Sequence, residues 1–157
     1  MARADLSTGE FTVAEGSTRD LFEEIAKTAP SEILIPRDLD EKIVARLKQL
    51  NPRAFVTQLD DWHFLPESAE AILKDHFGVS SLEGFGCGGL VLAVGAAGAL
   101  VSYLRQTQKR VLPHLANLRV HRASLYMEID EDSLTNLEIL KPLRHEDEGA
   151  CLIEVID

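Results

Sequence analysis

The sequence of 157 residues has few cysteines and, as a whole, a deficit of positive charge. Cys87 and Cys151 are its two cysteines; they form no CxxC spacing and are too few for a disulfide framework. We therefore expect a reducing, cytoplasmic setting. The first residues contain no apolar stretch after their basic residue, so we expect no secretory signal.

Acidic side chains outnumber basic ones by 26 to 16, which gives a formal net charge of −10. This excludes the simplest nucleic-acid-binding protein, a basic domain held to phosphate by counterion release. The charge is uneven, because residues 85–127 contain five basic residues and no acid, whereas both flanking segments are net negative. The hydrophobic content of 45% is that of a folded protein, and the length fits one domain or one domain plus part of another.

Hydrophobic spacing predicts strands and helices in alternation over the first half of the chain. The expected elements are a strand at Phe11–Val13, a helix after an N-cap at Ser17, a strand at 32–36, a helix at 38–50, a strand at 54–59 and a helix at 66–77. This order is an α/β pattern. The first of these strands lies so close to the start of the chain that we expect no partner strand before it.

A glycine-rich segment from Gly84 to Gly89 spells GxGxxG and precedes a predicted helix. A dinucleotide site needs such glycines directly after a strand, with an acid about 20 residues further on. Here the preceding residues are not typical of a strand, and the next acid is Glu128. We therefore expect a structural loop that leads into a tightly packed helix, and a nucleotide-binding module is kept as an alternative.

The uncharged run from Gly84 to Leu104 raises the question of a membrane span. Once the glycine loop is set aside, roughly 15 helical residues remain, fewer than the ~20 that a bilayer requires. Small residues at 95–99 favour close backbone approach inside a folded domain, so we expect no membrane segment. The cations that follow, Arg105, Lys109 and Arg110, complement the helix dipole, and a phosphate contact by them stays open.

Candidate catalytic groups are scattered. Asp60 and Asp61 could bind a metal with a third carboxylate such as Asp5 or Asp75, as nucleases require. Adjacent acids on a strand point to opposite faces, however, and the histidines form no HExxH pair. A phosphate-binding Walker A sequence is also absent. We therefore predict no metal site and no catalytic signature.

Seven segments resemble, in order, the MutS family of DNA mismatch repair ATPases, at the passage from its connector domain to its core domain. They are DLSTGEF at 5–11, PSEILIP at 30–36, HFG at 76–78, LEGFG at 82–86, AAGALVSYLRQTQKRVLPHLANL at 96–118, LYMEIDEDSLTNLEI at 125–139 and GACLIEVID at 149–157. The resemblance covers nearly the whole chain.

The resemblance implies a ribonuclease H-like α/β connector domain over residues 1–122. It also implies that this domain lacks its N-terminal strand here, which would leave an unpaired sheet edge. Residues 123–157 would begin the helical core domain, with its first helix starting near Ala150 and the last few residues mobile or packed against a neighbour.

The resemblance further implies a non-catalytic connector that links mismatch recognition to the ATPase and clamp and offers a surface to MutL. ATP and magnesium would bind the parent's ATPase domain, which also forms the parent homodimer. Mismatched DNA would be bound by other domains, because the family's Phe-x-Glu wedge is not in this chain. The helix at 66–77 matches part of the family's MutL-contacting surface.

The residues expected to face MutL are Glu70, Ala71, Ile72, Lys74 and Asp75. Ala71 and Ile72 stand where another family member has glutamines, which puts those two contacts in question. Two other functions remain as alternatives. One is a ribonuclease H-like nuclease that uses Asp5, Asp60 and Asp61, and the other is nucleotide binding by the Gly84–Gly89 loop.

Overall fold

The computed structural model describes residues 1–108 and 115–121. Contacts divide the chain into two units after His121, and every described residue belongs to the first unit. The expected core-domain start at 123–157, including the helix near Ala150, lies outside the described residues, as do Lys109 and Arg110. The proposed domain boundary at 122 stays a prediction.

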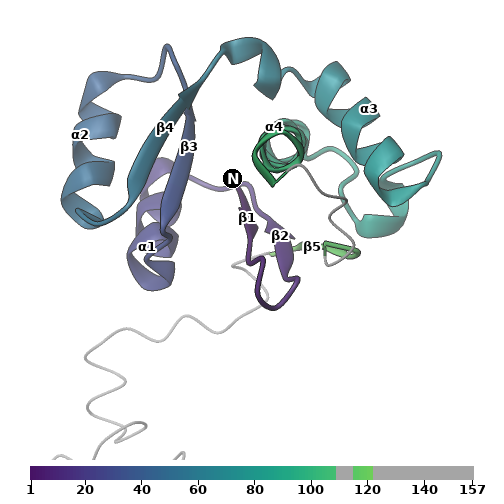
Figure 1. Cartoon of the computed structure of the whole chain (residues 1–157), viewed down its shortest axis with the longest axis horizontal. Helices are drawn as coiled ribbons and strands as arrows, with labels where there is room; N and C mark the ends of the chain where they lie inside the picture. The colour runs from purple at the N-terminus through teal and green to yellow at the C-terminus, as the bar shows by residue number, and fades with distance from the viewer. Residues whose placement is uncertain (109–114, 122–157) are drawn as a thin grey trace, which may run out of the picture. The chain divides into compact units, whose positions relative to one another are not determined.

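Helices and strands alternate from Ser17 to Gly78, as the hydrophobic spacing predicted (Figure 1). The elements are β1 (Ala2–Ala4), β2 (Phe11–Val13), α1 (Thr18–Thr28), β3 (Glu32–Pro36), α2 (Glu41–Leu50), β4 (Phe55–Leu59), the short 3-10 helix η1 (Asp61–Phe64), α3 (Pro66–Phe77), a second 3-10 turn η2 (Glu83–Phe85), α4 (Val91–Gln108) and β5 (Leu118–Val120). The unit is therefore mixed α/β.

The strands form two separate hydrogen-bonded sheets. One has the order β1-β2-β5, with β1 antiparallel and β5 parallel to β2; in the other, β3 and β4 run parallel. The expectation that the strand at Phe11 has no partner before it is wrong, because Ala4 lies opposite Phe11 and Ala2 opposite Val13. The Ala-Arg-Ala sequence of β1 has no β-branched or aromatic residue and therefore gave no strand signal.

Local capping explains where the helices begin and end. The Ser17 side chain accepts a hydrogen bond from the Asp20 backbone, and the Asp20 carboxylate accepts one from the Ser17 backbone, so the first turn of α1 has a complete capping box. Helix α3 begins with Pro66 and ends at Gly78, whose φ of 65° closes the helix in the left-handed conformation. Both sets of boundaries agree with the sequence prediction.

The first hydrophobic cluster joins α1, α2, β3 and β4. Ile25, Ile35 and Leu47 are its buried members, and partly exposed apolar residues surround them. Only one face of the β3–β4 sheet contributes, because Ile33 and Ile35 alternate with residues of the opposite face. We call this group the α1–α2 cluster.

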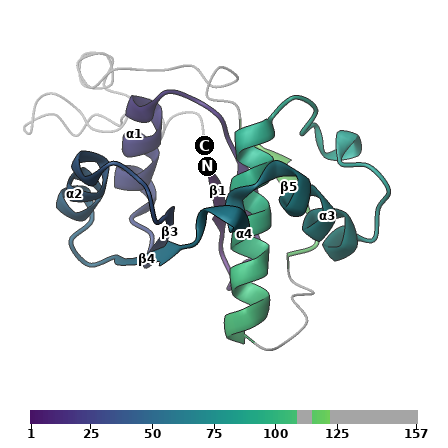
Figure 2. The same cartoon turned by 90° about the horizontal axis from the view of Figure 1, so that it is seen from above.

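The second hydrophobic cluster surrounds α4, which packs against α3 and also contacts β1 and β2 (Figure 2). Thirteen described residues of this α4 cluster are buried. Gly95 and Gly98 allow the close approach: a Cβ atom at Gly95 would lie 2.5 Å from the carbonyl oxygen of Phe64, and one at Gly98 would overlap Ala69 of α3. The prediction that small residues in this helix permit close backbone contact is confirmed.

Helix α4 is the longest helix among the described residues, at 18 residues. Among residues 1–108 and 115–121, no helix combines the length and apolarity that a membrane crossing requires.

Candidate functional site

Helix α3 is the element that the sequence predicted to face a partner. Ala69 and Leu73 are fully buried against α4 and fix which side of α3 points inward. Glu70, Ala71 and Asp75 are exposed. Ala71 and Asp75 lie four residues apart on one line along the helix, and Glu70 lies on the neighbouring part of the outer surface. We call the exposed surface formed by these three residues the α3 strip. Ile72 lies outside this strip, because it packs partly against the α4 cluster.

The charged residues of α3 are paired within the chain. Lys74 Nζ lies 2.7 Å from Glu70 Oε1, one helical turn away. Asp75 Oδ2 accepts a hydrogen bond from Arg105 Nη1 of α4 at 2.9 Å. The two ion pairs are solvent-exposed, so each contributes at most about 1 kcal/mol and can be exchanged for a partner's charge at low cost. The arrangement suits a polar, reversible contact.

His76 anchors the C-terminal end of α3. Its Nε2 atom lies 2.9 Å from the carbonyl oxygen of Leu115, a residue of the connection before β5. The neighbouring Phe77 ring stacks against Phe11 of β2 at 6.3 Å between centroids. The α3 strip is thus presented by a helix that is held at its end and along its buried side.

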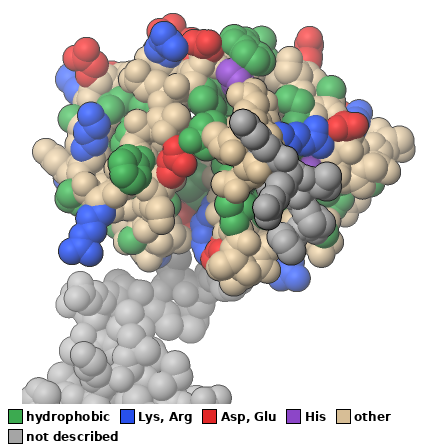
Figure 3. Space-filling view, viewed as in Figure 1, with side chains coloured by type: hydrophobic (Ala, Val, Ile, Leu, Met, Phe, Trp, Pro, Cys, Tyr) green, Lys and Arg blue, Asp and Glu red, His purple; other side chains and the backbone are tan. Residues whose placement is uncertain are grey.

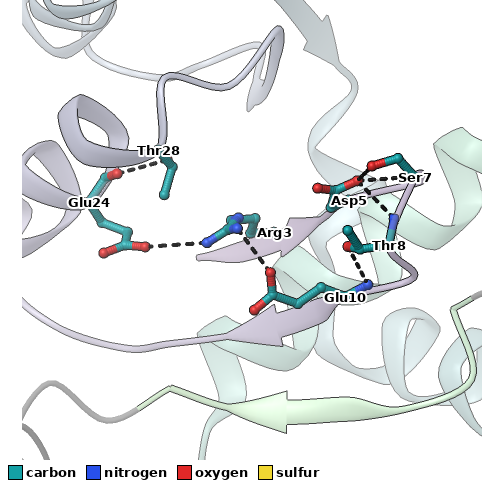
Figure 4. A network of polar contacts seen from close by, with 7 residues as sticks. All are labelled: Arg3, Asp5, Ser7, Thr8, Glu10, Glu24 and Thr28. Atoms are coloured by element: carbon teal, nitrogen blue, oxygen red, sulfur yellow. Dashed lines mark hydrogen bonds and ion pairs between the residues drawn. The ribbon is translucent and has the colours of Figure 1, made fainter. Parts of the chain in front are cut away.

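The segment DLSTGEF forms the turn between β1 and β2 (Figure 4). One carboxylate oxygen of Asp5 accepts hydrogen bonds from the backbone N–H and hydroxyl of Ser7, at 2.8 and 2.6 Å, and from the backbone N–H of Thr8 at 3.2 Å. These hydrogen bonds lower the pKa of Asp5. Gly9 has a φ of 77°, which glycine adopts without strain. Asp5 therefore has a turn-stabilising role.

The Arg3 side chain connects this hairpin to α1 (Figure 4). Its Nη2 atom donates to Glu10 Oε2 at 3.0 Å, and its Nη1 atom lies 3.8 Å from Glu24 Oε1. The same guanidinium therefore connects β1 to the residue before β2 and to α1.

The acids that a nuclease would require are engaged in different places. Asp5 holds the β1–β2 turn, while Asp60 follows β4 and pairs with Arg37 at 3.0 Å. In the part of the chain that the structure describes, no three His, Cys, Asp or Glu residues are grouped closely enough to hold a metal ion. The carboxylate cluster on which the nuclease alternative depends is therefore missing from these residues.

The glycine-rich segment begins within η2, which follows α3, and no strand precedes it directly, so the geometry of a dinucleotide site is absent here. Gly86 and Gly89 have φ values of 76° and 82°, so glycine is needed there for the backbone path. Cys87 is buried in the α4 cluster, and burial raises the pKa of its thiol. The loop is built to enter α4, as predicted.

Two polar contacts were not expected from the sequence. The Glu15 carboxylate accepts a hydrogen bond at 2.8 Å from the backbone N–H of Ala93, in the first turn of α4. The Tyr103 hydroxyl donates to Glu32 of β3 at 2.7 Å. Each pair is separated by more than 70 residues in the sequence, so no local pattern could have revealed it.

The basic residues after the apolar run are only partly described. Arg105 is exposed at the end of α4 and is paired with Asp75. Over the face drawn in Figure 3, basic and acidic side chains are interspersed. An intramolecular pair with Asp75 accounts for the position of Arg105, and the phosphate contact that the sequence left open stays untested.

Comparison with known proteins gives one consistent result. The family model described as MutS domain II matches residues 1–116. Curated proteins named DNA mismatch repair protein MutS are 39% identical to the chain in Methanococcoides burtonii, over 98% of the chain, and in Desulfosudis oleivorans, over 99%. MutS of Chlamydia trachomatis serovar L2b is also 39% identical, over 98%.

The chain spans only 18–19% of the length of these relatives. The similarity nevertheless runs along nearly all of its own residues, and the domain II match includes α3, the glycine-rich loop and α4. The resemblance seen in the seven sequence segments is thereby confirmed: the chain belongs to the MutS family of DNA mismatch repair proteins, and residues 1–116 match its domain II.

Proposed function

We propose that this chain is a non-catalytic connector segment of a mismatch repair ATPase, and that the α3 strip is its contact surface for MutL. In this proposal the parent protein binds mismatched DNA and ATP through other domains, while the connector links the two activities. Its fold would be the ribonuclease H-like one implied by the family, in a soluble, cytoplasmic protein whose ATPase domains form a homodimer.

The observation that carries the MutL proposal is the exposed α3 strip on a firmly held helix. Glu70, Ala71 and Asp75 are accessible, while Ala69 and Leu73 beneath them are fully buried. A transient partner needs a surface that stays folded when it is free, and the strip meets that need because its polar groups are already satisfied within the chain.

The test exchanges charges on α3 in the full-length protein. We expect Lys74→Glu with Asp75→Lys to weaken MutL binding at least tenfold, measured by surface plasmon resonance with immobilised MutL. The matched control is Lys42→Glu, a charge reversal on the exposed start of α2, which is expected to leave binding unchanged. Unchanged MutL binding by the α3 variant, with its circular dichroism spectrum and melting temperature intact, would contradict the proposed surface.

The connector role is tested by comparing DNA binding of this chain and of the full-length protein. A gel shift with heteroduplex and homoduplex DNA should show mismatch-selective binding by the full-length protein alone. Tight mismatch-selective binding by the 157-residue chain would overturn the proposal, because it would place mismatch recognition inside this segment.

A further inference from the structure

Four of the six large apolar side chains that are exposed among the described residues lie at or next to two elements that contact each other, η1 and α4, and the other two lie in the β1–β2 turn and in β4. Trp62 is 54% exposed, Leu65 53%, Val91 54% and Leu92 75%. Two of these residues belong to η1 or directly follow it, and two form the start of α4. Single exposed apolar residues are ordinary, but a group of four including a tryptophan is typical of a surface that another molecule covers.

The two elements that carry these residues touch each other. A Cβ atom at Gly95 would lie 2.5 Å from the carbonyl oxygen of Phe64, so the end of η1 contacts the first turns of α4 directly. Val91 and Leu92 lie four and three residues before Gly95 and therefore on the same side of the helix. We name the surface formed by Trp62, Leu65, Val91 and Leu92 the η1–α4 surface.

Acidic residues surround this surface. The carboxylate of Glu15 is bound to the backbone of Ala93 at 2.8 Å and is thus fixed beside Leu92. Asp61 precedes Trp62, Glu67 follows Leu65 by two residues, and both are exposed. Their negative charge opposes binding of nucleic acid phosphate and complements lysine or arginine side chains.

We propose that the η1–α4 surface is the docking site for a neighbouring domain of the same full-length polypeptide, which covers it with an apolar surface bordered by lysine or arginine. The inference rests on the proposed function, since both treat the chain as one segment of a longer protein. In the MutS relatives, more than four-fifths of the polypeptide lies outside the part that matches this chain. Permanent interfaces are more apolar than transient ones. The η1–α4 surface therefore suits a permanent covering, whereas the α3 strip, with its ion pairs, suits a partner that leaves.

The experiment measures how fast single cysteines react with a maleimide dye in the 157-residue chain and in the full-length protein. Leu92→Cys is the probe, and Ala71→Cys on the α3 strip is the matched control, because both sites are exposed and helical. The background carries Cys151→Ser, and any other cysteines of the full-length protein are replaced; Cys87 is buried.

We expect Leu92→Cys to react at least tenfold more slowly in the full-length protein than in the isolated chain, while Ala71→Cys reacts equally fast in both. Equal reactivity of Leu92→Cys in the two proteins overturns the inference. Protection of Leu92→Cys that appears only after MutL is added also overturns it, because the covering partner would then be a separate protein.

The two proposals fail in different ways. Added MutL should slow labelling of Ala71→Cys in the full-length protein if the α3 strip is its contact surface, and absence of that effect counts against the proposed function alone.

Quenching of Trp62 fluorescence by acrylamide provides a second measurement, since Trp62 is the only tryptophan of the chain. A blue-shifted, unquenched emission from the isolated chain would overturn the docking inference, because the surface would not be open.

Discussion

The α4 cluster and the α1–α2 cluster use helices packed on short strands, yet they bury their side chains to different extents. In the α4 cluster, thirteen described residues are buried, and α4 approaches α3 so closely that glycine is required at Gly98. In the α1–α2 cluster, Ile25, Ile35 and Leu47 are the buried members among the described residues, and their apolar neighbours remain partly exposed. The two clusters lie in the same unit of the chain.

The contrast teaches that the type of element does not determine the depth of a core. Helix α4 has neighbours on more than one side, namely α3, η1 and the β1–β2 strands, so its small residues become fully enclosed. Helices α1 and α2 pack against the same face of a two-stranded sheet and leave much of their remaining surface exposed. The contacts that run between the two regions, such as Tyr103 with Glu32 and Arg3 with Glu24, are polar.

The largest expected effect compares one leucine from each cluster. Leu73→Ala should reduce the free energy of unfolding by about 2–5 kcal/mol, because Leu73 is fully enclosed and the cavity cannot collapse. Leu47→Ala should cost less, about 2 kcal/mol, because its partly exposed neighbours can relax into the space. Urea unfolding measures both, and an equal or larger loss at Leu47 would break the comparison.

The second prediction concerns the close helix approach in the α4 cluster. Gly98→Ala should destabilise the chain by about 1–3 kcal/mol, because the new Cβ overlaps Ala69 and the cost exceeds the gain of about 1 kcal/mol in helix propensity. Gly88→Ala is the control, since nothing lies within 4 Å of a Cβ there. A neutral Gly98→Ala in thermal unfolding would mean that α3 and α4 do not pack as tightly as their glycine contact requires.

The third prediction uses a strained residue in the α1–α2 region. Ala29 ends α1 with a φ of 41°, a conformation that costs an alanine about 1 kcal/mol or more. Ala29→Gly should therefore stabilise the chain by about 0.5 kcal/mol, after the greater freedom of glycine in the unfolded chain is subtracted. Ala26→Gly inside α1 should have the opposite sign, and a loss of stability at both positions in urea titrations would argue against the left-handed cap.

The fourth prediction tests the polar contact between the two regions. A double-mutant cycle with Tyr103→Phe and Glu32→Ala, each of which removes one partner of the hydrogen bond, should give a coupling energy of about 0.5–1 kcal/mol, because the hydrogen bond is solvent-exposed. Thr57→Val is a useful comparison, since Thr57 also donates to Glu32, but from within the β3–β4 sheet. A coupling of zero for Tyr103 together with a clear coupling for Thr57 would mean that the regions are not joined by this contact.

The smallest expected effect is a dependence on pH at the first turn of α1. Hydrogen bonds from the Ser17 backbone and side chain lower the pKa of Asp20, so its contribution to stability is present above the unfolded value of about 3.9. That contribution is lost as the pH falls through the lower folded pKa. When the pH is lowered below about 4, the Asp20→Asn variant should therefore lose less stability than the unmodified chain. The measurement is the free energy of unfolding of both proteins as a function of pH, and an identical pH dependence would count against the capping box.

Much of the fold could be predicted because the relevant signals are local. The capping pattern at Ser17 and Asp20, the proline at the start of α3 and the glycine after its end each act within a few residues, and the structure places all of them as predicted. β1 and η1 were missed, since the first is too short and too small in its side chains to show alternation. The separate β3–β4 sheet was not foreseen either.

The candidate site was predictable only in part. Helix α3 and its exposed Glu70, Ala71 and Asp75 followed from spacing and family resemblance, but Ile72 packs partly into the α4 cluster, which the sequence pattern did not indicate. The pairing of Asp75 with Arg105 spans 30 residues, and a hydrogen bond over that distance depends on how two helices pack. The η1–α4 surface was not predicted at all, because its members come from two separate elements.

The amino-acid sequence by itself determined the helices, the positions of the strands that alternate with them, the structural role of the glycine-rich loop and membership of the MutS family. Capping, backbone restriction by proline and glycine, and hydrophobic spacing all operate between near neighbours, so one sequence suffices to show them. The tertiary structure alone decided which glycines of α4 are indispensable, which acids are already engaged and where apolar side chains remain uncovered. Those properties depend on the distance between segments far apart in the chain, and that distance is set only when the whole core packs.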